Sequence, residues 1–273
     1  MKKGLFFLMI FCATYLQAQE NNTLRTELDS IINNYPLMQQ ASLGIMVYDV
    51  TAETLLYNMD EKKLHRPAST TKTFTCATAL KNLGPDYGIR TSIYGTGKIH
   101  RHHIDGQRKN VLEGDLWVKG NFDPAFTSAD LDTLLMGLQA HHIDSIAGNI
   151  YADMTMKNRT LTGYGWGWDD TGDDSPLLSP LVLDKDTCFM TKLTRGLENL
   201  GIGVKGTVGD SILPKDAQLL AEKCRTLQEI LPHCLKDSDN RYAESILYQL
   251  GNLNDTDYDK TETCISFVNQ LIV

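Results

Sequence analysis

A serine and a lysine stand three positions apart in the stretch RPASTTKTF, at Ser69 and Lys72. On a helix this spacing puts both side chains on one face. A neutral lysine amine there could take the hydroxyl proton and turn the serine into a nucleophile. Backbone N–H groups of a first helical turn could stabilise an oxyanion beside it. The alternative is an ordinary helix whose N-terminus is capped by the serine.

A second polar cluster, Ser238-Asp239-Asn240, lies far along the chain from Lys72, so only the fold could join the two. It falls between two predicted helices, and a turn there can aim a hydroxyl and a carboxamide into a cleft. Here too a capped helix is the alternative, with Asp237 or Ser238 at its start.

The elements before and around the first cluster can be predicted from apolar spacing. Residues 24–35 have helical periodicity, and ASLGIMVYDV and ETLLYNM, separated by TA, indicate an antiparallel hairpin. RPASTTKTFTCATALKNLG predicts a helix that ends at Gly84. Its apolar stripe is expected at Phe74, Ala77 and Leu80.

The middle of the chain changes character near Thr91. Short strands are expected in TSIYGTGKI, VLEGDLWVKG and IAGNIYAD, with one helix in ADLDTLLMGLQAHH and another in MTKLTRGLENLG. From AQLLAEKCRTLQEILPHCL onward the chain is predicted to be helical again, as is NRYAESILYQLG. Helix and hairpin thus flank a strand-rich middle, a pattern typical of a discontinuous α/β domain with a β-rich insertion.

The bulk composition excludes some classes of function. The 273-residue chain carries a net charge of −8, which argues against a broad nucleic-acid footprint.

The first residues predict export. Lys2 and Lys3 precede a short apolar run, and LQA ends at Ala18, so a signal peptide cleaved after Ala18 and a periplasmic location are expected. No later segment is apolar enough for a membrane helix.

Other candidate sites are weaker. Five cysteines follow the predicted signal, an odd number without any C-x-x-C, which favours scattered core thiols. GIGVKG follows a predicted helix rather than a strand, so it fails as a dinucleotide motif. The histidines at 100, 102, 103, 141 and 142 could bind a metal, but a polar loop and a helix end are the favoured explanation. We expect Trp117, Trp166 and Trp168 to be packing residues, with glycan stacking as the alternative.

Together the motifs resemble the D-alanyl-D-alanine carboxypeptidase/endopeptidase (DacB-type penicillin-binding protein) family. The matching stretches occur in family order and are RPASTTKTFTCATAL, EGDLWVKGNFDPAF, IAGNIYAD, GYGWGWDD, SPLVLDKD and KDSDNRYAESILYQLG. The resemblance implies a partial β-lactamase/transpeptidase-like α/β (α+β) fold with an inserted β-rich domain. The corresponding divisions would be a signal peptide (1–18), an N-terminal transpeptidase-like part (19–90), an abbreviated insertion (91–212) and a helical part with the S-D-N motif (213–273).

The resemblance also implies roles for the residues. Ser69 would attack the carbonyl of the penultimate D-alanine and form an acyl-enzyme, with Lys72 as general base. Ser238, held near Lys72, would relay a proton to the leaving amine, and Asn240 would hydrogen-bond the substrate amide and the lysine. Peptidoglycan stem peptides would be the substrates and β-lactams the inhibitors, without metal or organic cofactor.

The third family motif, K-T-G, is absent from this sequence, as are K-S-G and H-T-G. In the family, that strand supplies an oxyanion N–H, a donor that can contribute about 2.7–4 kcal/mol. The expectation is therefore of a C-terminally truncated or degenerate member. A catalytically impaired remnant that binds peptidoglycan or a partner is the alternative, and a β-lactamase, for which no deacylation base is identified, is the third.

Overall fold

The structure is a computed structural model that describes residues 23–157, 160–163, 165–171, 175–251 and 261–272. The predicted signal peptide lies outside these residues. Contacts divide the chain into two units, Met1–Ala68 and Ser69–Val273. Within the described residues, none of the helices combines the length and hydropathy that crossing a bilayer requires.

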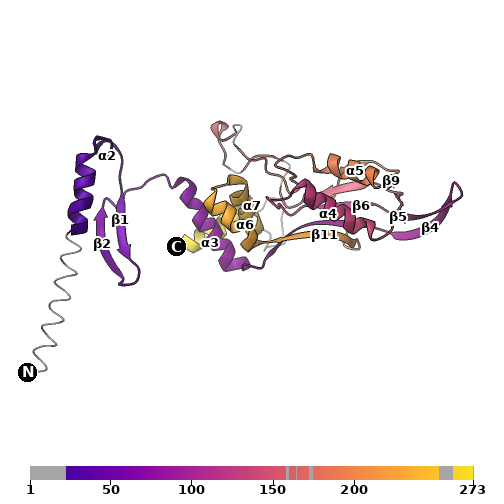
Figure 1. The fold of residues 1–273 in the computed structure, drawn as a ribbon, viewed down its shortest axis with the longest axis horizontal. Helices are drawn as coiled ribbons and strands as arrows, with labels where there is room; N and C mark the ends of the chain where they lie inside the picture. Colours follow the sequence, from indigo (N-terminus) through magenta and orange to yellow (C-terminus); the bar gives the residue numbers. More distant parts are fainter. Residues whose placement is uncertain (1–22, 158–159, 164, 172–174, 252–260, 273) are drawn as a thin grey trace, which may run out of the picture. The chain divides into compact units, whose positions relative to one another are not determined.

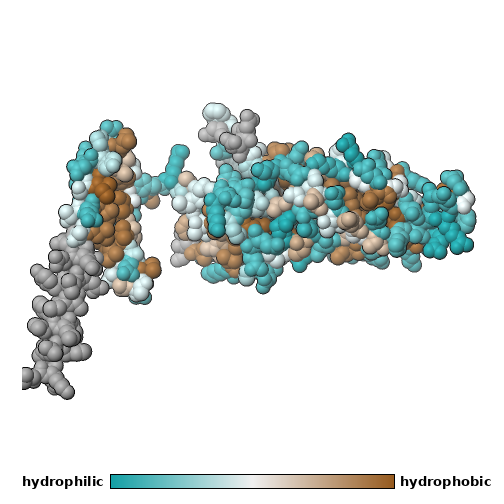
Figure 2. Space-filling model, viewed as in Figure 1, coloured by the Kyte–Doolittle hydropathy of each residue, from teal (hydrophilic) through white to brown (hydrophobic). Residues whose placement is uncertain are grey.

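The first unit contains the predicted helix and hairpin. Residues 23–34 are helical, followed by α2 (Pro36–Gln40). Strands β1 (Ile45–Asp49) and β2 (Thr54–Met59) pair antiparallel with a bulge at Val47/Tyr48, as the alternation predicts. Figure 2 shows apolar side chains gathered on one face of this unit. Met46, Tyr48 and Leu55 are among its exposed apolar residues.

The second unit is built on two sheets. The five-stranded sheet has the order β10-β8-β6-β3-β11. β10, β8 and β6 pair in parallel, β3 pairs antiparallel with β6, and β11 pairs antiparallel with β3. The bounds are β3 Gly88–Gly95, β6 Leu116–Lys119, β8 Ile150–Asp153, β10 Val208–Asp210 and β11 Gln218–Thr226. The four-stranded sheet β4-β5-β7-β9 comprises Lys98–Ile104, Gln107–Glu113, Ser145–Ile146 and Gly203–Val204.

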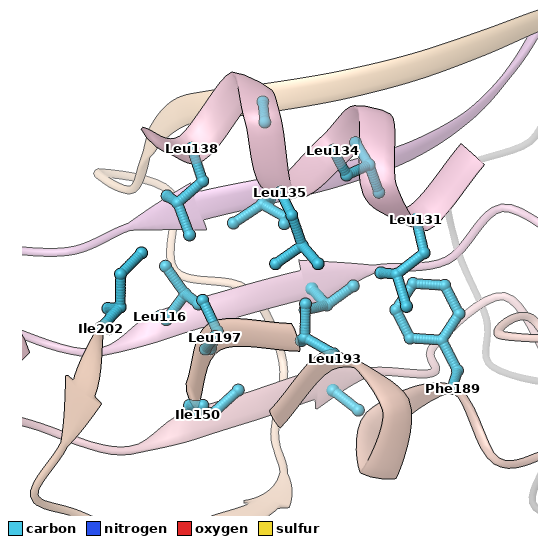
Figure 3. Packing of buried hydrophobic residues seen from close by; sticks show 14 of the residues in the cluster. Leu116, Leu131, Leu134, Leu135, Leu138, Ile150, Phe189, Leu193, Leu197 and Ile202 are labelled. Carbon is cyan, nitrogen blue, oxygen red and sulfur yellow. The ribbon is translucent and has the colours of Figure 1, made fainter. Parts of the chain in front are cut away.

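Two predicted helices, α4 (Ser128–Gln139) and α5 (Phe189–Asn199), cover the sheet and form the main core with it. Figure 3 shows their leucines interdigitating with sheet residues such as Leu116 and Ile150. A capping box fixes the start of α4, because Thr127 and Asp130 bond each other's backbone N–H groups. This part of the structure agrees with the strand-rich middle predicted from the sequence.

The remaining helices form a second cluster. α3 (Thr71–Leu83) packs with α6 (Leu227–Lys236), α7 (Asn240–Gly251) and α8 (Thr261–Ile272), and Figure 1 shows α3, α6 and α7 gathered at one end of the sheet. Their shared core contains Cys76, Ala79, Ile230, Cys234 and Ile246. Segments from both sides of the strand-rich middle therefore meet, as expected for a discontinuous α/β fold.

The prediction of a single helix in AQLLAEKCRTLQEILPHCL is wrong for its first half, because residues 218–226 form strand β11. The second half is helical, as predicted, in α6. The Ala, Leu, Glu and Lys residues favour a helix, but tertiary pairing overrides that propensity. β11 pairs antiparallel with β3 over its length, and Ala221 joins the main core. Across the pair, Glu222 accepts a hydrogen bond from Ser92 at 3.2 Å.

The apolar stripe predicted for α3 is also wrong. The helix and its end at Gly84, which has a φ of 81°, are confirmed. Phe74 and Leu80, however, remain 41% and 42% exposed. The helix instead buries a largely polar face, whose members are Lys72, Thr75, Cys76, Thr78 and Ala79. That face lies against the helices that carry the second predicted motif.

Candidate active site

Ser69 lies in a short 3-10 turn, η1 (Ala68–Thr70), directly before α3. It does not cap the helix: the N-cap position belongs to Thr70, which makes no side-chain capping bond. Lys72, in the first turn of α3, places its Nζ 3.1 Å from Ser69 Oγ. The serine is exposed while the lysine is buried, so the amine lies beneath a hydroxyl that reaches the surface.

The second motif lies in the turn between α6 and α7. Lys72 Nζ is 3.3 Å from Ser238 Oγ and 2.6 Å from Asn240 Oδ1. Ser238 has a φ of 56°, a left-handed conformation that costs a non-glycine residue about 1–3 kcal/mol and that typically occurs at functional sites. This conformation turns the chain between the helices so that serine and asparagine both reach the lysine.

The central residue of the motif, Asp239, has a structural part in the turn. Its Oδ1 accepts hydrogen bonds from the backbone N–H groups of Arg241, at 2.8 Å, and Tyr242, at 3.4 Å. The helix is therefore capped by Asp239, and not by Asp237 or Ser238 as the capping alternative supposed. Its other oxygen lies 3.3 Å from Nε2 of His233 on α6. The carboxylate thus fixes the start of α7 and ties it to α6, which positions Asn240.

The four predicted site residues thus meet around one amine. A neutral amine at this position can accept a proton from either serine hydroxyl. The amide oxygen of Asn240 orients the amine by accepting its hydrogen bond, and leaves the carboxamide N–H₂ as the part that can donate to a ligand. A serine with a base in contact and a second hydroxyl on the same base is an arrangement suited to nucleophilic acyl transfer.

One further carboxyl group near the site could not be recognised from the motifs. Glu244 lies one turn after Asn240 on α7, and burial raises the pKa of its side chain. A hydrogen bond from Trp166 and the charges of Lys157 and Lys72 act in the opposite direction. The i, i+4 spacing from Asn240 was the available signal, but an exposed face of an amphipathic helix would show the same spacing.

The tryptophan and histidine side chains that the sequence did not assign to the main site differ from one another in their surroundings. Trp117 is buried and Trp166 packs beside Phe122 and Tyr248, as predicted, but Trp168 is 90% exposed and so is not a packing residue. Nε2 of His102 lies 2.8 Å from Glu113 Oε1 on the neighbouring strand. Among the described residues, no group of three or more His, Cys, Asp or Glu side chains is placed to hold a metal ion.

Fold and site together define a class: an α/β protein in which a serine–lysine pair and a serine–asparagine pair meet between helices. A family model described as D-Ala-D-Ala carboxypeptidase 3 (S13) matches residues 24–195 and 176–270. The chain therefore belongs to the D-Ala-D-Ala carboxypeptidase 3 (S13) family, in agreement with the resemblance found in the motifs.

Curated proteins are similar in sequence, among them two D-alanyl-D-alanine carboxypeptidases. The D-alanyl-D-alanine carboxypeptidase of Actinomadura sp. (strain R39) is 30% identical over 172 residues, which are 63% of this chain and 30% of that protein. The D-alanyl-D-alanine carboxypeptidase DacB of Haemophilus influenzae is 25% identical over 134 residues, 49% of this chain and 26% of that protein. The matched segments thus span less than a third of the length of either relative.

A solved structure shares the fold. Penicillin binding protein 4 (dacB) from Haemophilus influenzae matches with a TM-score of 0.70 at 19% identity, over 83% of this chain and 67% of that one. The same protein in complex with a β-lactam matches with a TM-score of 0.64, over 84% and 65% of the chains. The predicted transpeptidase-like α/β fold is confirmed by this likeness.

Proposed function

We propose that this protein is a serine-type D-Ala-D-Ala carboxypeptidase/endopeptidase that acts on peptidoglycan peptides through an acyl-enzyme. The observation that carries the proposal is the position of Lys72 Nζ, within 3.3 Å of Ser69 Oγ, Ser238 Oγ and Asn240 Oδ1. Two of these partners are separated from the lysine by 166 and 168 residues. Membership of the S13 family supports the reaction class.

In the acylation step, Ser69 Oγ attacks the carbonyl carbon of the penultimate D-alanine while Lys72 Nζ accepts the hydroxyl proton. The new C–O bond forms and the C–N bond to the terminal residue breaks. Ser238, in contact with the same amine, passes the proton from Lys72 to the leaving nitrogen. The carboxamide of Asn240 hydrogen-bonds the substrate amide and keeps the scissile bond beside Ser69.

Deacylation reverses the proton path. Lys72 takes a proton from a water molecule, which attacks the ester carbonyl, and Ser69 regains its hydroxyl as the shortened peptide leaves. A β-lactam follows the first step, but its amide nitrogen stays tethered to the acyl group after the ring opens. The adduct is then hydrolysed slowly, which makes β-lactams inhibitors of the proposed reaction.

The proposed substrate places the mature protein in the periplasm, after cleavage of the signal peptide near Ala18. Peptidoglycan stem peptides are the proposed partners there. The four site residues lie in the second unit, so the proposal depends on that unit and its helical cluster.

Labelling with a fluorescent penicillin tests the proposal. We expect a covalent adduct on the wild-type chain, located on Ser69 by peptide mass spectrometry, and none on Ser69→Ala. Ser211→Ala, at an exposed serine outside the site, is the matched control and should label like wild type. A folded wild-type protein without an adduct contradicts the proposal, and muropeptide binding that survives Ser69→Ala without turnover would favour a binding protein instead.

A further inference from the structure

Two buried cysteines lie in contact beneath the site. Cys76 Sγ donates a hydrogen bond to Cys234 Sγ at 3.7 Å, and their side chains belong to α3 and α6. Both residues are nearly inaccessible, with relative exposures of 2% and 0%. They are 158 positions apart in the sequence, so neither spacing nor motif brings them together.

Their positions on the two helices are related to the site. Cys76 follows Lys72 by four residues on α3, and Cys234 precedes Ser238 by four residues at the end of α6. Lys72 and Cys76 are four apart within α3, so their side chains lie on one face of that helix, a single turn from each other. The sulfur contact therefore lies about one turn from Lys72 and joins α3 to α6, the helix that leads into the turn with Ser238.

We propose that Cys76 and Cys234 form a redox-active dithiol that closes to a disulfide in an oxidising medium and cross-links α3 to α6 beneath the serine–lysine cluster. A disulfide has an S–S distance of about 2.05 Å, so the sulfurs at 3.7 Å need to approach by less than 2 Å. Rotation about χ1 of one or both cysteines supplies movements of this size.

The electrostatics of the pair suit this chemistry. The hydrogen bond from Cys76 lowers the pKa of Cys234, and the charge of Lys72 adds to this effect, while burial acts in the opposite direction. The same bond, together with burial, raises the pKa of Cys76. In the folded protein the two thiols therefore hold their protons unequally, and Cys234 is the sulfur nearer to the thiolate form.

Oxidation by a small disulfide such as oxidised glutathione balances in two exchanges. The Cys234 thiolate attacks one sulfur of glutathione disulfide, forms a mixed disulfide and releases one glutathione thiolate. Cys76 loses its proton, and its thiolate attacks Cys234 Sγ and expels the second glutathione. Two protein thiols are oxidised by two electrons, and one glutathione disulfide is reduced. Because both sulfurs are buried in the folded protein, glutathione reaches them before α3 and α6 have packed, and the product is the same if Cys76 makes the first attack and Cys234 the second.

The experiment uses the full chain, unfolded and reduced, then refolded in a buffer of reduced and oxidised glutathione. Remaining thiols are blocked with N-ethylmaleimide in denaturant, and the chain is digested with trypsin without reductant. Each cysteine falls in its own tryptic peptide; Cys76 lies in TFTCATALK and Cys234 in TLQEILPHCLK. We expect these two peptides to be joined in the dominant cross-linked species.

Two results overturn the proposal: the peptides of Cys76 and Cys234 each carry N-ethylmaleimide after refolding, or the dominant cross-link joins other cysteines. A second readout is the melting temperature of the refolded protein before and after dithiothreitol. We expect reduction to lower it by on the order of 5 °C or more in wild type and in Cys224→Ala, an exposed control. The shift should vanish in Cys234→Ala, and its persistence there contradicts the assignment.

Discussion

The helices α3 and α4 are similar in length but bury different kinds of side chain. α4 faces the sheet with Leu131, Leu134, Leu135 and Leu138, and this face follows directly from its apolar spacing. α3 turns Lys72, Thr75 and Cys76 inward and leaves Phe74 and Leu80 exposed. An apolar stripe thus correctly predicts the buried face of α4, which packs in the main core. It predicts the wrong buried face for α3, whose buried face includes the candidate catalytic lysine.

The same contrast extends to α7, which packs beside α3. Its inward residues include Ser245, whose hydroxyl donates to the backbone oxygen of Phe122, and Gln249, whose side chain donates to Asn121 at 2.7 Å. These bonds tie the helical cluster to the loop after β6. Buried polar groups of this kind are satisfied by specific partners and so fix orientation more sharply than apolar contacts do.

The largest expected effect is on the rate of acylation, from a substitution in α3 that leaves the protein folded. If the proposed function holds, Lys72→Ala lowers the rate of acylation by fluorescent penicillin about 10²–10⁴-fold, because it removes the base in contact with Ser69. Far-ultraviolet circular dichroism should remain that of the folded protein. Lys81→Ala, at an exposed lysine near the end of the same helix, is the control and should label at the wild-type rate. Equal labelling rates for the two variants would contradict the role of Lys72.

The next largest effect is a loss of stability expected from a charged cluster beside the five-stranded sheet. There Arg225 of β11 forms ion pairs with Asp123 at 3.2 Å and Asp130 at 2.8 Å. Arg225→Met should cost about 3–5 kcal/mol of unfolding free energy, because the buried Asp123 loses its positively charged partner. Burial raises the pKa of Asp123 and Arg225 opposes this, so the pKa rises further in the variant. The deficit should therefore be small in acid, where Asp123 is protonated in both proteins, and grow as pH rises through the folded-state pKa of Asp123, which lies above the unfolded value of about 3.9. A deficit independent of pH in urea titrations would be inconsistent with this mechanism.

The comparison of the two helices can be tested directly with apolar truncations. Leu134→Ala on α4 should lower the unfolding free energy by about 2–5 kcal/mol, because Leu134 is 1% exposed in the main core. Phe74→Ala on α3 should change it by no more than about 0.5 kcal/mol, since that ring lies outside the core. Chemical denaturation of both variants is the measurement. A larger loss for Phe74→Ala would mean that the predicted stripe of α3 is buried after all.

The smallest effect concerns Glu244, whose pKa is raised by burial. Because the folded state holds this proton more tightly than the unfolded state, the resulting stability is fully present below about pH 4.3 and is lost as pH rises through the folded pKa. The unfolding free energy of wild type relative to Glu244→Gln should therefore fall as pH rises through this window. A difference that stays flat across this pH window would refute the shift of Glu244.

Much of the fold could be predicted because helices and hairpins form between residues that are close together in the sequence. The hairpin of β1 and β2, the helix α3 with its end at Gly84, and the leucine face of α4 all follow from periodicity and turn residues. β11 could not be predicted in this way, since its Ala, Leu, Glu and Lys residues favour a helix. Its strand conformation depends on pairing with β3, which lies more than 120 residues earlier in the chain.

For the site, the sequence by itself determined which residues carry the chemistry: Ser69 with Lys72, and Ser238 with Asn240, in motifs whose spacing and order define the family. Only the tertiary structure decided that all four meet at one amine, that Asp239 caps α7, and that Cys76 reaches Cys234. The physical reason is distance along the chain. Contacts within a helical turn are set by local spacing, whereas contacts across more than 150 residues exist only once α3, α6 and α7 pack together.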